Sequence, residues 1–180
     1  QASGSANTDT ETITITVTDV APVVTDNDQS IAEAQNNAAT VATIVTTADD
    51  DGISWSIASG NEDTDSDGTS AFTIDSATGV ITVADEDDLD AESSTGDSFA
   101  LVVRATDGTT PDTETITITV TNTNPTVTDN DQSISEAQDN SAVVATIVTT
   151  GDDTGIAWSI ASGNEDTDSD GTSAFAIASG

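Results

Sequence analysis

The chain has 180 residues and a formal net charge of -33, because 34 acidic residues are balanced by a single basic one, Arg104. This charge excludes nucleic acid and anionic membranes as partners, since both are bound through several basic side chains, and no apolar run is long enough for direct membrane insertion. Histidine, cysteine and lysine are absent, so the usual nucleophile–base pairs cannot be assembled and we expect no enzyme activity.

The sequence repeats with a period of 103 residues, as Trp55 and its counterpart Trp158 show. A period this long corresponds to one whole domain. We therefore predict a tandem array of repeats, in which the ends of this chain do not coincide with the boundaries between repeats. Residues 1–22 are the C-terminal strand and linker of a preceding repeat, residues 23–124 are a complete repeat, and residues 125–180 are the N-terminal half of the following repeat.

Alternation of apolar and polar residues predicts seven strands in the complete repeat. In chain order they are Ser30–Ala34, Val41–Val45, Ile53–Ile57, Phe72–Ile74, Val80–Val83, Ser98–Thr106 and Thr115–Thr121. Trp55 shares one face with Ile53 and Ile57, so we expect it to anchor the core. The alternating run Thr12–Val17 predicts a copy of the seventh strand.

Seven short strands in one repeat, with no helical period, predict an all-β fold, a seven-stranded Greek-key β-sandwich of the immunoglobulin-like kind. The repeat then predicts tandem sandwiches in a linear array. The joins Thr18–Val23 and Thr121–Thr126 are short and each contains a proline, which suits a stiff connection.

One acidic loop, DTDSDG at Asp63–Gly68, recurs at Asp166–Gly171. The DxDxDG spacing is that of the first half of an EF-hand loop, with carboxylates at alternate positions and glycine at the sharp turn. The twelfth position would be Ile74 instead of glutamate, so a solvated loop without an ion is the alternative. The candidate ligands are Asp63, Asp65 and Asp67 in one copy and Asp166, Asp168 and Asp170 in the other.

The order of motifs along the complete repeat resembles that of the cadherin family, which has a glutamate near the first strand, an acidic loop, an LDRE-like segment and an acidic linker. The matching segments are AEA (Ala32–Ala34), TTADDDG (Thr46–Gly52), AFTIDSATGVITV (Ala71–Val83), LDAE (Leu89–Glu92), ATDG (Ala105–Gly108) and TITITVTNTNP (Thr115–Pro125). In its acidity and in the near-identity of its copies, the chain resembles bacterial surface proteins with long arrays of cadherin-like repeats.

The resemblance implies Ca²⁺ at the joins between domains. At the second join the upper domain would supply Glu33, Asp90 and Glu92, the linker Asn122 and Asn124, and the lower domain Asp152 and Asp153. At the first join the linker would supply Asp19 and the complete repeat Asp49, Asp51 and Asp107. The linker is shorter than the family's D-x-N-D-N-x-P, so we expect one or two ions per join. The alternative is that these acids form a salt-adapted, solubilising surface.

These observations predict calcium-stiffened extender repeats of a secreted or cell-surface adhesin, with neighbouring repeats as partners and an extracellular location. One alternative is a repeat subunit that self-associates into an extracellular filament or sheath. Another is a carbohydrate- or ice-binding module, which would need an exposed aromatic or a flat face. Against it, Trp55, Trp158 and the three phenylalanines all occupy expected core-facing positions. The repeats themselves do not indicate the adhesion target.

Overall fold

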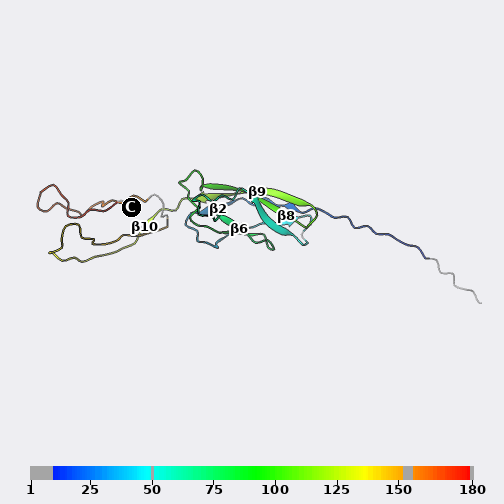
Figure 1. Cartoon of the computed structure of the whole chain (residues 1–180), viewed down its shortest axis with the longest axis horizontal. Coiled ribbons are helices and arrows are strands. Elements are labelled where there is room, and N and C mark those ends of the chain that lie inside the picture. Colours follow the sequence, from blue (N-terminus) through cyan, green and yellow to red (C-terminus); the bar gives the residue numbers. More distant parts are fainter. Residues whose placement is uncertain (1–9, 50, 152–155, 179–180) are drawn as a thin grey trace, which may run out of the picture.

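The computed structural model describes residues 10–49, 51–151 and 156–178. Throughout these ranges the regular secondary structure is β, and none of it forms a helix that could cross a membrane. Figure 1 shows one strand-rich body. Residues 10–22 lead away from it on one side, and the loops that follow β10 lie on the other.

The larger sheet of the body has four strands, and its centre is the hairpin of β8 (Ser98–Thr106) and β9 (Pro111–Thr121). The two strands pair antiparallel from Ser98 opposite Thr119 to Thr106 opposite Pro111. Their alternating sequence turns every second side chain inward, as predicted from the sequence. The buried residues are Phe99, Leu101, Val103, Ala105, Ile116, Ile118 and Val120.

Two outer strands complete this sheet, with the order β2-β9-β8-β5. β2 (Gln29–Ala32) pairs parallel with β9, and β5 (Ser54–Ser59) pairs antiparallel with β8. Trp55 enters the core from β5 and is only 7% exposed, so the predicted core anchor is confirmed.

A three-stranded sheet, β3 (Thr40–Thr43), β7 (Val80–Val83) and β6 (Phe72–Ile74), supplies the opposing layer. Phe72 from this sheet packs edge-to-face on Phe99 from the other, with ring centroids 5.0 Å apart. The core therefore lies between two sheets, and the seven predicted strands are all present. A short ribbon of β1 (Val23–Val24) and β4 (Thr46–Thr47) is additional, because two-residue elements carry no alternation to detect.

The strand predicted at Thr12–Val17 is absent. Ile13, Ile15 and Val17 are 80%, 83% and 89% exposed, whereas the same pattern in β9 is buried. The difference lies in the neighbours, since β9 pairs with β8 and β2 while residues 12–17 pair with no described strand. Alternation makes a segment able to form a strand, but hydrogen-bonded neighbours are required to stabilise it.

The described residues beyond the second join keep only one strand pair, β10 (Thr126–Val127) with β11 (Thr149–Thr150), which repeats the β1–β4 ribbon. The prediction that every aromatic side chain faces a core is wrong for Phe175, which is 47% exposed. Its counterpart Phe72 is buried against Phe99, whereas Phe175 packs on no other aromatic ring among the described residues.

Gly79 closes the turn between β6 and β7 directly beneath the core tryptophan. Its φ is 69°, and an added Cβ would lie 2.6 Å from the Ile44 carbonyl oxygen and 2.9 Å from Trp55 Cε2. Gly52 has nearly the same φ, 68°, and open space where its Cβ would be. A comparison of these two glycines therefore separates the cost of the left-handed backbone conformation from the cost of a steric clash.

We expect Gly79→Ala to lower the free energy of unfolding more than Gly52→Ala. The left-handed conformation costs about 1–2 kcal/mol in both variants, whereas overpacking against Trp55 adds about 1–3 kcal/mol only at position 79. Urea denaturation of both variants with EDTA present measures the difference. Equal midpoints would contradict the close packing of Gly79.

Candidate metal centres

Acidic side chains gather at both ends of the sandwich, and the β8–β9 hairpin separates them. Asp107 directly follows β8 at the hairpin turn. Glu33 follows β2 at the opposite end, where its amide donates to the carbonyl of Thr121, the last residue of β9. Because β9 has 11 residues, the two ends are on the order of 35 Å apart at a rise of about 3.3 Å per residue.

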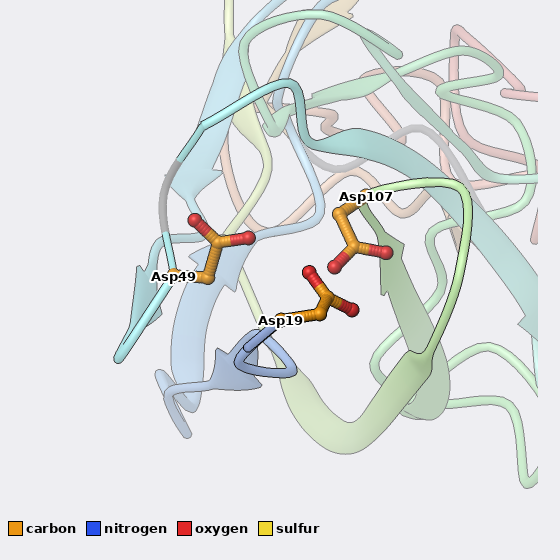
Figure 2. Close-up of side chains that lie close together, drawn as sticks. All are labelled: Asp19, Asp49 and Asp107. Carbon is orange, nitrogen blue, oxygen red and sulfur yellow. The ribbon is translucent and has the colours of Figure 1, made fainter. Parts of the chain in front are cut away.

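The first cluster contains Asp19, Asp49 and Asp107, whose carboxylate oxygens lie within 4.8 Å of one another. Figure 2 shows the three side chains turned toward a shared space from three separate segments. The hydroxyl of Thr109 lies 2.6 Å from Asp19 Oδ2 and 2.8 Å from Asp107 Oδ1, so its one proton is donated to either carboxylate. Through these contacts Thr109 connects Asp19, in the linker before the module, to the turn between β8 and β9.

The carboxylate of Asp107 is held in a fixed orientation by the turn that follows it. Its Oδ1 accepts hydrogen bonds from the amides of Thr109, at 2.7 Å, and Thr110, at 3.1 Å. The backbone and then the side-chain hydrogen bonds of Thr109, with that of Thr110, lower the pKa of Asp107. Its Oδ2 is inaccessible to solvent and has no hydrogen-bond partner. The group is therefore kept ionised, with one oxygen left for a ligand.

The second cluster contains Glu33, Asp90 and Glu92, again with carboxylate oxygens within 4.8 Å of one another. Glu33 is buried, and it accepts hydrogen bonds from the amide of Ala91, at 3.0 Å, and from the amide of Thr123. One carboxylate thus joins the end of β2, the LDAE segment and the linker after β9.

The remaining ligands expected at the joins are placed differently. Asp51 lies outside the first group of three, and its amide donates to Asp49 Oδ1 at 3.1 Å. Asn122 and Asn124 are exposed on either side of Thr123. Asp152 and Asp153 lie outside the described residues.

The DTDSDG loops bring together the acids that their spacing indicated. Asp63, Asp65 and Asp67 form one group within 4.8 Å, and Asp166, Asp168 and Asp170 form another. In both copies the glycine amide donates to the first aspartate, at 2.9 Å from Gly68 and 2.8 Å from Gly171. The loop conformation is therefore set within the loop itself.

Three residues near these clusters were not expected from the sequence. Thr109 links two carboxylates of the first cluster, and Asp85 and Asp88 are buried beside the DTDSDG loop. The D-G-T order after β8 is a recognisable turn signal for Thr109. Asp85 and Asp88 carry no such signal, because only the fold places them against the loop.

The chemistry of all four groups favours a hard divalent cation. Each offers at least three carboxylate oxygens, which are the ligands that calcium prefers in proteins. The chain has one basic residue, so its own side chains cannot neutralise these groups.

Comparison with known proteins identifies one family for the chain. The family model described as "Cadherin domain" matches residues 27–121. Among solved structures, human protocadherin-24 EC1-2 is similar at 19% identity and a TM-score of 0.47, covering 73% of this chain and 60% of that one. Drosophila N-cadherin EC1-4 is similar at 20% identity and a TM-score of 0.47, covering 72% and 33%. The chain thus spans less than two thirds of either structure. The comparison with curated proteins found no match.

We expect Asp49→Asn to raise the free energy of unfolding when EDTA is present at low ionic strength. The substitution removes one of three clustered negative charges, worth about 1 kcal/mol of repulsion per pair at these distances, and the asparagine oxygen still accepts from the Asp51 amide. Asp26→Asn changes an exposed aspartate outside the four groups and is the matched control. Urea denaturation with and without 0.5 M NaCl measures the free energy of unfolding of both variants. If Asp49→Asn raises it no more than Asp26→Asn does, the three carboxylates do not repel one another as proposed.

Proposed function

Because the chain belongs to the cadherin domain family, we propose that its modules are calcium-stiffened extender repeats of a cell-surface or secreted adhesin. Such repeats hold a distal binding region away from the cell. The observation that carries the proposal is the placement of the acidic clusters at the two ends of one sandwich, next to the linkers, instead of on its sheet faces.

The two clusters are complementary halves of one kind of join. The first combines the linker residue Asp19 with Asp49 and Asp107 of the module that follows it. The second combines Glu33, Asp90 and Glu92 of the module that precedes the next linker. When one module follows another at the 103-residue period, the two halves meet at the same linker. Each join would then hold carboxylates from both domains and the linker.

These two acidic clusters also explain how binding of a cation would change the stiffness of the join. Without cations, two sets of clustered carboxylates repel each other across the linker, which favours separation of the domains. A divalent ion reverses the sign of this interaction and ties both domain ends to one point. Extracellular calcium modules bind in the range of about 0.1–1 mM, so the joins would be occupied outside the cell.

We expect calcium to raise the melting temperature of the EDTA-treated chain and to slow amide exchange in residues 18–22 and 107–110 by at least about tenfold, since ion binding stabilises only the folded join. Calorimetry and hydrogen exchange measure the two effects, and small-angle scattering measures the length of the particle. If calcium changes neither the melting temperature nor the particle length, the proposal is wrong.

Asp107→Asn is the variant that tests the first join alone. We expect it to weaken the calcium-dependent protection of residues 18–22, because it removes the charge from the unpartnered Asp107 oxygen while keeping an acceptor for the Thr109 amide. Asp26→Asn should leave this protection intact. A calcium response that survives Asp107→Asn unchanged would place the ion elsewhere.

A further inference from the structure

Asp88 is a fully buried carboxylate that neither end cluster uses. It is 0% exposed, and it lies two residues before Asp90 in the segment that connects β7 to β8. Its Oδ1 accepts hydrogen bonds from the amide of Thr64, at 2.5 Å, and from the Thr64 hydroxyl, at 2.8 Å, and also from the amide of Asp65, at 3.2 Å. Its Oδ2 is equally inaccessible and has no hydrogen-bond partner.

These contacts place Asp88 against the backbone of the DTDSDG loop, beneath the group formed by Asp63, Asp65 and Asp67. The hydrogen bond from the Asp67 amide lowers the pKa of Asp65, but desolvation and the nearby acids Asp67, Asp63 and Asp88 raise it overall. Desolvation likewise raises the pKa of the buried Asp85, with repulsion from Asp67 and Asp88. Five acids from two distant segments therefore share one side of the module.

A buried carboxylate with an unpartnered oxygen is costly unless a positive charge lies nearby. No side chain of this protein offers one, because Arg104 is the only basic residue and no contact between it and these acids is formed among the described residues. The hydrogen bonds from Thr64 and Asp65 satisfy Oδ1 of Asp88 and direct these loop amides toward the carboxylate. Oδ2 of Asp88 has no such partner, so it is available as a negatively charged ligand for a cation.

We propose that the Asp63–Gly68 loop and Asp88 together hold a divalent cation of the calcium class within the module, separate from the ions at its ends. The three loop carboxylates supply oxygens within 4.8 Å of one another. Asp88 lies outside this group of three and adds a fourth negative charge beside it, through its hydrogen bonds from Thr64 and the Asp65 amide. In an EF-hand the fourth acid is the glutamate at the twelfth position. Ile74 occupies that position here and lies in β6.

The site has a structural consequence for the second join. Asp88 is anchored to the loop, Leu89 is buried in the core, and Asp90 and Glu92 follow immediately as members of the end cluster. A cation between the loop and Asp88 therefore orders the segment that carries two ligands of the join.

The test is a calcium titration of the EDTA-treated, ¹⁵N-labelled chain, followed at the backbone amides of Gly68 and Gly171. The two glycines lie in identical DTDSDG loops, but among the described residues no buried carboxylate is placed against the second loop, so Gly171 reports on the motif without a fourth acid. We expect a saturable shift at Gly68 and a midpoint at least about tenfold higher at Gly171, in keeping with the effect of supporting groups on metal affinity. Equal midpoints would show that the motif alone binds.

Asp88→Asn separates a cation site from a purely structural carboxylate. Asparagine keeps the Oδ1 acceptor for the Thr64 and Asp65 amides but removes the charge and replaces Oδ2. We expect the Gly68 midpoint to rise at least about tenfold, whereas a wild-type midpoint in the folded variant overturns the assignment.

Asp65→Asn, at an exposed position, tests the loop independently of the core, in case Asp88→Asn impairs folding. It should raise the Gly68 midpoint in the same way. Asp107→Asn should leave that midpoint unchanged while abolishing the response at residues 107–110, so failure of this site and failure of the joins give different results. No saturable shift at Gly68 in the wild type overturns the proposal.

Discussion

Negative charge without a counter-charge from the protein is the constraint on which the arrangement of this molecule depends. Thirty-four acids and one arginine leave carboxylate repulsion as the dominant electrostatic term. Acids spread evenly over the surface would have minimised it. Instead, groups of three lie within 4.8 Å of one another, at the two ends and in the DTDSDG loops. Such grouping raises the repulsion between neighbouring carboxylates when no cation is present.

The sandwich core makes this grouping possible by separating the two ends. The long β8–β9 hairpin is buried along one face. On the other face β9 carries threonine, whereas β8 carries Ala100, Val102 and Arg104. It sets the hairpin turn with Asp107 at one end and the Thr121 carbonyl beside Glu33 at the other. The two clusters are therefore far beyond a Debye length of about 8 Å and do not influence each other directly.

Repetition gives the same sequence two environments, and the comparison shows which interactions are local. The DTDSDG loop has the same glycine hydrogen bond in both copies, and the β10–β11 ribbon repeats β1–β4. By contrast, the TITITV run is a buried strand after Pro111 and an exposed segment after Thr8. Phe72 and Phe175 differ in the same way. Turns of a few residues form from their own sequence, whereas strands and core contacts require partners distant along the chain.

The sequence by itself determined the alternation of the strands, the buried face of each and the acidic loop. The resemblance to cadherins added the acids expected at each end, of which the structure brings together two groups of three. Seven strands were predictable because their period-2 alternation coincides with paired neighbours, whereas the same alternation at Thr12–Val17 forms no strand. The tertiary structure alone decided that Asp88 lies under the loop, that Thr123 binds Glu33 and that Thr109 links Asp19 to Asp107. These contacts join residues 24, 90 and 90 positions apart. No local pattern encodes such pairs, because they arise only when packing of the two sheets brings separate loops to the same place.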